Sequence, residues 1–350
     1  MKIASIIGAR PQFIKYAPLS RELRKLHQEI IIHTGQHYDY EMDRVFFDEL
    51  EIPKPGYNLE VGSGTHGYQT GEMLRRIEGV LVTENPDLVL VYGDTNSTLA
   101  GALAAVKLQI KVGHVEAGLR SFDKTMPEEI NRVLTDHCSD YLFCPTQTAA
   151  DNLKREGIVR GVYVTGDVMV DALLYNKEIA ERSNILDRLG LESNKYLVST
   201  IHRQANTDYE ENLRSIVDAY CEIDEIIVFP LHPRTEKFLK EYGLYGRLTE
   251  KVKLTEPLGY LEFLKLLSHA MKVLTDSGGI QKEAYILKVP CITLRDNTEW
   301  VETVEDGWNV LVGVDKERIV RMAREFQPNG EQRNIFGQDA CQEISKAIGH

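Results

Sequence analysis

The sequence predicts an α/β protein with two domains of the Rossmann type, each built on a parallel sheet. Short apolar segments alternate with longer amphipathic segments from one end of the chain to the other. Continuous apolar strands separated by helices are typical of parallel sheets that are covered on both faces. Twelve such strands are too many for one domain of this kind, and 350 residues are enough for two.

The predicted strands share a short run of apolar or β-branched residues. They cover residues 2–7, 29–33, 88–92, 112–115, 141–143, 162–164, 196–200, 225–229, 252–254, 271–275, 289–293 and 309–312. Helical periodicity lies between them, for instance over residues 11–26, 95–108, 213–221, 260–268 and 340–348. The strand at 162–164 closes the first series, so we expect one domain over residues 1–167 and a second over 168–335.

Composition narrows the class of protein. The formal net charge of −12 argues against nucleic acid or an anionic membrane as the main partner. Five cysteines lack CxxC spacing and indicate free thiols in a reducing compartment. No apolar run approaches the length of a membrane span, and the chain starts directly with a strand rather than a signal peptide. A cytoplasmic protein is therefore expected.

The most informative segment is Asp276-Ser277-Gly278-Gly279, which follows a predicted strand and opens a predicted helix over 280–287. Two glycines at a helix start let a ligand approach bare backbone N–H groups, and the helix dipole favours an anion there. Glu283 lies one turn further on, where a carboxylate can accept hydrogen bonds from sugar hydroxyls. The segment predicts a nucleoside diphosphate site; the alternative is an ordinary strand–turn–helix.

Polar residues follow several of the predicted strands directly. In open α/β sheets, ligands bind beyond the carboxyl ends of the strands. The segments that satisfy this rule are 8–10, 35–37, 93–96, 116–120, 202–203, 232–234 and 276–279. Both predicted domains contribute to this set, so we expect the site to lie in a cleft between them.

The first predicted domain supplies charged candidates. Arg10 and Lys15 place two cations near the start of a helix, where they suit a phosphate or a carboxylate; the alternative is a solvated helix start. Asp94 follows a strand and is a candidate catalytic carboxylate. The alternative is that Asp94 is the N-cap of the next helix, although Thr95 could also be that N-cap. Glu116 needs a partner if it is buried, either in a site or in a salt bridge with Arg120.

The helix that begins near Pro127 carries a further candidate pair. Its apolar residues Ile130, Val133, Leu134 and His137 form one face, which we expect to pack on the core. Glu128 and Arg132 lie on the opposite face, so Glu128 is expected to point away from the core into a cleft, with Arg132 beside it. The alternative for Glu128 is a first-turn acidic residue favoured by the helix dipole.

In the second domain, His202 ends a predicted strand and is followed by Arg203. A histidine there suits proton transfer or phosphate binding, and a structural histidine is the alternative. The candidate His, Asp and Glu residues lack compact metal-ligand spacing, so zinc is not expected.

Taken together, these segments resemble the non-hydrolysing UDP-N-acetylglucosamine 2-epimerases over essentially the whole chain. The motifs that carry the resemblance are Gly8-Ala9-Arg10-Pro11…Lys15, Tyr92-Gly93-Asp94-Thr95, His114-Val115-Glu116-Ala117-Gly118-Leu119-Arg120, Pro127-Glu128-Glu129…Asn131-Arg132, His202-Arg203 and Asp276-Ser277-Gly278-Gly279-Ile280-Gln281…Glu283. The resemblance implies a GT-B-like fold with two Rossmann-like domains facing across a nucleotide-sugar cleft, a last helix (about 336–350) that returns to the first domain, a homodimer, and no NAD or metal.

The resemblance also implies roles for these residues. UDP departs from C1 of the sugar, a carboxylate removes the proton from C2, and an enzyme-held 2-acetamidoglucal is protonated on its opposite face before UDP returns. Asp94, Glu116 and Glu128 are implied as the catalytic carboxylates, and His202 is implied to aid departure of UDP. The residues implied to hold the substrate are Arg10, Lys15, Arg132, Arg203, Phe263 near the uracil, Ser277, Gly278, Gly279 and Glu283.

Departures from the family pattern keep other substrates and activities open. The segments 202–206, 229–234 and 298–302 differ from the usual motifs, and Trp300 stands where the family has an arginine. With 11–15, they look similar to epimerases of UDP-2,3-diacetamido-2,3-dideoxyglucuronate. A GT-B glycosyltransferase, a hydrolysing epimerase and a non-enzymatic UDP-sugar sensor are further alternatives. The joint presence of three carboxylates argues against the sensor.

Overall fold

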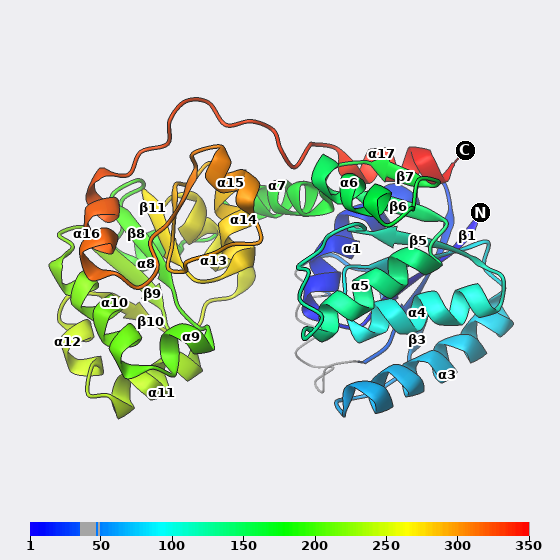
Figure 1. Ribbon diagram of the computed structural model, residues 1–350, viewed down its shortest axis with the longest axis horizontal. Coiled ribbons are helices and arrows are strands. Elements are labelled where there is room, and N and C mark those ends of the chain that lie inside the picture. Colours follow the sequence, from blue (N-terminus) through cyan, green and yellow to red (C-terminus); the bar gives the residue numbers. More distant parts are fainter. Residues whose placement is uncertain (36–46, 48–49, 350) are drawn as a thin grey trace. The chain divides into compact units, whose positions relative to one another are not determined.

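The computed structural model describes residues 1–35, 47 and 50–349, with the side chain of Arg10 outside the description (Figure 1). The chain divides into two compact units. Unit 1 comprises Met1–Ala172 together with Ile335–His350, and unit 2 comprises Leu173–Asn334. The C-terminal helix α17 (Ala340–Ile348) belongs to unit 1, where it packs against α1 (Arg10–Leu23).

Unit 1 is built on a seven-stranded sheet with the order β3-β2-β1-β4-β5-β6-β7, and all of its neighbouring strands are parallel. The strands are β1 (Lys2–Ile7), β2 (Gln28–His33), β3 (Tyr57–Asn58), β4 (Leu88–Tyr92), β5 (Lys111–Val115), β6 (Tyr141–Cys144) and β7 (Val162–Val164). Among the described residues, the other helices that begin in this unit are α3 (His66–Glu84), α4 (Asn96–Lys107), α5 (Pro127–Cys138), α6 (Gln147–Arg155) and α7 (Val168–Ala180). The last of these continues into unit 2.

Unit 2 has a six-stranded parallel sheet with the order β10-β9-β8-β11-β12-β13. Its strands are β8 (Tyr196–Thr200), β9 (Ile226–Pro230), β10 (Lys253–Thr255), β11 (Lys272–Thr275), β12 (Cys291–Thr293) and β13 (Asn309–Leu311). Its helices are α8 (Ile185–Leu189), α9 (Gln204–Thr207), α10 (Glu210–Glu222), α11 (Pro233–Glu241), α12 (Tyr245–Thr249), α13 (Tyr260–Ser268), α14 (Gly278–Ile286), α15 (Val301–Glu305) and α16 (Lys316–Glu325).

The predicted fold class, a GT-B-like pair of parallel-sheet α/β domains, is confirmed. All twelve predicted strands are present, with ends that shift by one or two residues. The strand β3 was not predicted, because its two residues carry no apolar run. In the described part of the chain, no helix has both the length and the apolar character that crossing a membrane requires.

The order of the strands in each sheet determines where the loops can form a ligand-binding crevice. In unit 1 the direction of sheet growth reverses between β1 and β4, and in unit 2 it reverses between β8 and β11. Loops at such a reversal separate and leave a crevice at the carboxyl ends of the strands. The loops after β1, β4, β8 and β11 therefore lie at these positions. Three of them contain Asp94, His202 and Asp276, and the loop after β1 leads directly into Arg10, the first residue of α1.

The packing of α5 differs from the prediction. Ile130 and Leu134 are 47% and 45% exposed, and the residues buried on this helix are Glu129, Asn131, Thr135 and Asp136. The expectation that the apolar face packs on the core is therefore wrong. The polar face packs instead, because most of its buried groups find hydrogen-bond partners. Glu128, at the start of the helix, is exposed, as expected.

Candidate active site

The centre of the unit 1 site is an ion pair between Lys15 of α1 and Glu116, the residue that follows β5. Both side chains are largely buried, with exposed fractions of 14% and 11%. Burial by itself lowers the pKa of Lys15, but the neighbouring charges of Glu116 and Asp94 outweigh it and raise that pKa above its ordinary value. The predicted alternative partner of Glu116, Arg120, binds Asp136 and Glu156 instead.

Glu116 also holds an unusual backbone conformation. Its φ of +75° lies in the left-handed region that side chains other than glycine rarely adopt. Two backbone hydrogen bonds fix the turn, since the N–H groups of Glu116 and Ala117 both donate to the carbonyl oxygen of Phe143, at 3.1 and 3.0 Å. A strained residue costs about 1–3 kcal/mol and is typical of functional sites, where the surrounding structure enforces a side-chain direction.

Asp94 lies in the turn between β4 and α4. The cap of α4 is Thr95, whose side chain accepts a hydrogen bond from the Thr98 N–H, so the predicted alternative role of Asp94 as N-cap is wrong. The carboxylate of Asp94 binds the guanidinium of Arg132, and its backbone carbonyl accepts a 2.9 Å hydrogen bond from the Asn131 side chain. Two neighbouring residues of α5 therefore hold Asp94 in place.

Arg132 has a second partner in Glu129, at 2.7 Å. Glu129 in turn accepts hydrogen bonds from the Ser121 and Phe122 backbone N–H groups. Burial raises the pKa of Glu129, but these hydrogen bonds and the one from Arg132 outweigh burial and lower it. Glu128 is exposed in the first turn of α5. The sequence predicted Arg132 beside Glu128, whereas the structure pairs Arg132 with Asp94 and Glu129.

In unit 2, Asp276 is fully buried and organises the loop after β8. Its carboxylate accepts hydrogen bonds from the backbone N–H groups of His202 and Arg203 at 3.0–3.2 Å, and from the Asn206 side chain at 3.1 Å. Burial raises the pKa of Asp276, but the His202 ring and these N–H donors outweigh burial and lower it. The side chains of His202 and Arg203 are partly exposed at this edge of the sheet, by 43% and 42%.

The predicted anion site has the expected local structure. Ser277 is the N-cap of α14, and its side chain accepts a hydrogen bond from the Ile280 N–H. Gly278 is buried and Gly279 is exposed at the first turn, while Glu283 is half-buried one turn further on. Phe263 lies half-buried on α13.

Two residues near Gly278 were not singled out from the sequence. The Glu299 carboxylate fills the space that a Cβ on Gly278 would take. Arg295 holds this carboxylate at 2.9 Å, and Arg203 lies 3.7 Å from it. Arg295 follows β12 closely, so the rule that selects polar residues beyond strand ends would have found it.

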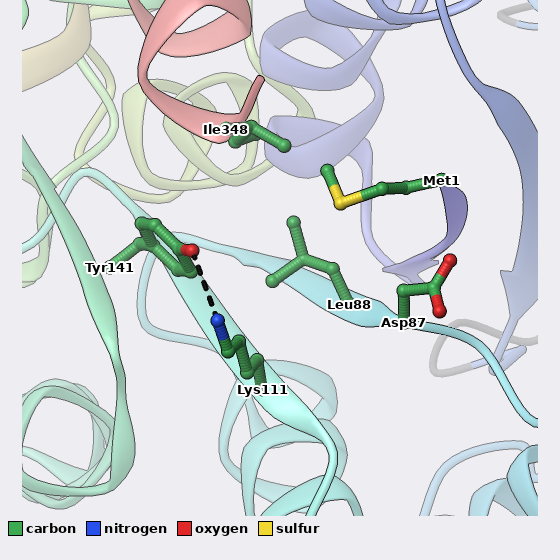
Figure 2. Close-up of a pocket in the computed structure, with 6 residues that line it drawn as sticks. All are labelled: Met1, Asp87, Leu88, Lys111, Tyr141 and Ile348. Carbon is green, nitrogen blue, oxygen red and sulfur yellow. Dashed lines mark hydrogen bonds between the residues drawn. The ribbon is translucent and has the colours of Figure 1, made fainter. Parts of the chain in front are cut away.

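A pocket of about 340 Å³ lies elsewhere, at the opposite edge of the unit 1 sheet (Figure 2). Lys111 and Tyr141, which begin β5 and β6, line it and form a 3.5 Å hydrogen bond, with Leu88 at the start of β4. Strand starts are not where ligands bind in sheets of this type, so this pocket is separate from the candidate site. Among the described residues, no group of His, Cys, Asp or Glu side chains gathers as a metal site.

The chain is similar to known proteins over almost its whole length. Residues 21–349 match the model of a family described as UDP-N-acetylglucosamine 2-epimerase. A Methanococcus maripaludis protein named UDP-N-acetylglucosamine 2-epimerase homolog is 61% identical over 97% of this chain and 96% of its own. A Pseudomonas aeruginosa UDP-2,3-diacetamido-2,3-dideoxy-D-glucuronate 2-epimerase is 51% identical over 93% of this chain and 92% of its own.

A solved structure is also similar. The Methanocaldococcus jannaschii UDP-GlcNAc 2-epimerase, in complex with UDP-GlcNAc and UDP, matches this chain with a TM-score of 0.85 and 51% identity. The match covers 100% of this chain and 99% of that one.

Proposed function

The chain belongs to the UDP-N-acetylglucosamine 2-epimerase family of isomerases, and we propose that it interconverts UDP-GlcNAc and UDP-ManNAc by inverting C2 of the sugar. One observation carries this proposal. The carboxylates of Asp94 and Glu116 follow the adjacent strands β4 and β5, and each is held by its own cation, Arg132 or Lys15. Two fixed carboxylates suit proton removal and proton return at one carbon.

The chemistry explains why carboxylates are needed. The proton on C2 is a very weak acid because C2 is not next to a carbonyl group. If the C1–O bond breaks and UDP leaves with the electron pair, the positive charge that develops at C1 acidifies this proton. One carboxylate then takes the proton, and the C–H electrons form a C1–C2 double bond. Return of a proton to the other face of C2, with addition of UDP oxygen to C1, gives the epimer.

We assign the proton transfers to Asp94, Glu116 and Glu128. Glu128 shares its helix face with Arg132, which binds Asp94, so these groups belong to one edge of unit 1. Lys15 is the counter-ion of Glu116, and we propose that it also faces the substrate, as the sequence predicts. Arg10 begins α1 at the same edge, and we retain it as a substrate-binding residue from the sequence alone.

Unit 2 is proposed to hold UDP. The start of α14 offers the N–H groups of Gly278 and Gly279 to the diphosphate, with Ser277 beside them and Glu283 for the ribose. His202 and Arg203 supply positive charge for the departing UDP, and Phe263 is proposed to contact the uracil. Charge stabilisation by fixed donors is often the largest contribution to catalysis of this kind.

A second candidate substrate is UDP-2,3-diacetamido-2,3-dideoxyglucuronate. The similar Pseudomonas aeruginosa enzyme supports it, as do the variant segments at 229–234 and 298–302. The reaction would be the same, with a different sugar. The two are separated by measuring kcat/KM for each UDP-sugar with the purified protein. We expect UDP-GlcNAc to be the better substrate, and a higher value for the uronate would reverse the assignment.

We also propose that two copies of the chain associate. Ile130 and Leu134 form an exposed apolar stripe on α5, which a second copy would cover. Analytical ultracentrifugation should give twice the mass of the 39.8 kDa chain, and Leu134→Glu should shift the protein toward the monomer. A wild-type protein that sediments as a monomer at micromolar concentration would contradict this proposal.

A further inference from the structure

A buried histidine that is not among the proposed catalytic residues contacts the turns that carry Asp94 and Glu116. His114 is on β5 and is completely buried. One ring nitrogen, Nε2, is 2.7 Å from the carbonyl oxygen of Gly93, and the other, Nδ1, is 2.6 Å from Oδ1 of Asp136. The side chain therefore bridges the end of β4 and the helix α5 from a position between them.

Both partners of the His114 ring are oxygen atoms that accept hydrogen bonds. A carbonyl oxygen can only accept a hydrogen bond, so Nε2 must donate to Gly93. Asp136 accepts further hydrogen bonds from the Gly118 N–H at 3.1 Å and from Arg120 at 2.7 Å, which is the pattern of an ionised carboxylate. Nδ1 faces this carboxylate, so the ring is held on both sides by hydrogen-bond acceptors.

This network touches both turns that carry the catalytic carboxylates. The peptide carbonyl of Gly93 joins directly to Asp94, and the Gly93 N–H donates to Val115 at 3.0 Å. On the other side, the N–H of Gly118 binds Asp136 two residues after Glu116. Gly93 and Gly118 both have left-handed φ values, +65° and +80°, which glycine adopts readily, so both residues allow the chain to turn sharply near a carboxylate.

We propose that His114 is a positioning residue for the epimerase reaction, and that its hydrogen bond to the Gly93 carbonyl fixes Asp94 relative to Glu116. The proposal rests on the proposed function, because the value of this bond depends on proton transfer by those two carboxylates. A displacement of a reacting group by about 1 Å can cost about 100-fold in rate, which is the scale of effect that loss of this bond should have.

A matched pair of variants separates positioning from packing. In His114→Gln the side-chain amide can take the place of Nε2 and still donate to Gly93. In His114→Asn the amide takes the place of Nδ1 and reaches only Asp136. Both variants remove the ring, so they differ mainly in whether the hydrogen bond to Gly93 remains. His114→Met fills the same space without donors and replaces the Asn variant if that variant does not fold.

The measurements are kcat and KM with UDP-GlcNAc, UDP affinity by calorimetry, and deuterium exchange of the backbone amides at 93–96. We expect kcat to fall about 100-fold in His114→Asn and clearly less in His114→Gln, with KM and UDP affinity within about twofold of wild type. Amide exchange at 93–96 should accelerate in the Asn variant more than in the Gln variant.

Equal kcat values in the two variants, whether both high or both low, would overturn the proposal, because the hydrogen bond to Gly93 would then make no difference to the rate. Faster exchange without loss of kcat would overturn it too. A wild-type protein that leaves UDP-GlcNAc unchanged would instead contradict the proposed function. Even then, equal amide exchange at 93–96 in His114→Asn and His114→Gln would show that the hydrogen bond to Gly93 does not fix this turn.

Discussion

Lys15 of α1 and Glu116, the residue that follows β5, form an ion pair that is largely buried at the carboxyl edge of the unit 1 sheet. The pair joins two segments that are far apart in the sequence. It also supports a residue whose backbone is strained. The Glu116 carboxylate therefore has two roles: it is the proposed catalytic group, and it balances the charge of Lys15 in the folded protein.

Glu116→Gln should therefore destabilise the protein as well as inactivate it. The substitution leaves the Lys15 ammonium without its counter-ion, and breaking a buried pair from one side costs about 3–5 kcal/mol. The free energy of unfolding, measured with denaturant, should fall by about this amount, and kcat should be lost.

The double variant Lys15→Met/Glu116→Gln is the control for that result. Removing both charges should recover much of the lost stability without recovering activity, because a buried pair is often replaceable by apolar groups. A double variant as unstable as Glu116→Gln alone would mean that the strained turn, rather than the ion pair, depends on Glu116.

Glu128 and Glu129 are adjacent on α5 but should behave differently. Glu128→Gln removes an exposed carboxylate and should lower kcat by about 100-fold or more while stability and UDP affinity change little. Glu129→Gln disturbs the hydrogen bonds to Ser121 and Phe122 and should destabilise the protein by about 1–3 kcal/mol. Steady-state kinetics and thermal unfolding distinguish the two. A kcat of Glu128→Gln close to that of the wild type would show that Glu128 is not catalytic and is only an acidic first-turn residue that the helix dipole favours.

The contrast on α5 shows where sequence reasoning reached its limit. Short apolar runs predicted every strand but β3, since a strand buried on both faces must be apolar along its whole length. On α5 the same reasoning failed. Ile130 and Leu134 marked the apolar face, yet the polar face packs, because Asn131 and Asp136 find hydrogen-bond partners that only the tertiary structure brings within reach. The pairing of Lys15 with Glu116 depends on the same kind of long-range contact, and the expectation that Lys15 holds the substrate stays a prediction.

Glu299 should weaken UDP binding in the wild-type protein. Its carboxylate lies beside Gly278 at the start of α14, held by Arg295. A diphosphate at the same helix start would be repelled by it. Glu299→Gln should tighten UDP binding by about two- to fivefold, the scale of one charge near a helix terminus.

Isothermal titration calorimetry with UDP measures this effect, and Glu305→Gln on the exposed end of α15 is the matched control. The gain should shrink as salt is added, because the repulsion is electrostatic. Unchanged or weaker binding in Glu299→Gln would indicate that Glu299 holds Arg203 and Arg295 in place for the phosphate. No local sequence pattern predicts this contact, since Glu299 and Gly278 meet only through the fold.

Asp276 should make part of the stability of unit 2 sensitive to acid. Its folded pKa is lowered, so its contribution is fully present above the unfolded pKa of about 3.9 and is lost as the pH falls through the folded pKa. Asp276→Asn should cost about 1–3 kcal/mol at neutral pH. Denaturant unfolding of both proteins across the acid range should show their stabilities converging below about pH 4. A difference that stays constant with pH would assign the loss to geometry rather than to charge.

The account's central claim is that the chain epimerises C2 of a UDP-sugar by removing a proton and returning another. The most direct test is proton NMR of UDP-GlcNAc incubated with the protein in D2O. We predict UDP-ManNAc as the product, with deuterium at C2 and with the nucleotide still attached, because the proton removed from one face is not the proton returned to the other. A product without deuterium at C2 would contradict proton transfer with solvent exchange, and free UDP with free ManNAc would contradict a reversible epimerase.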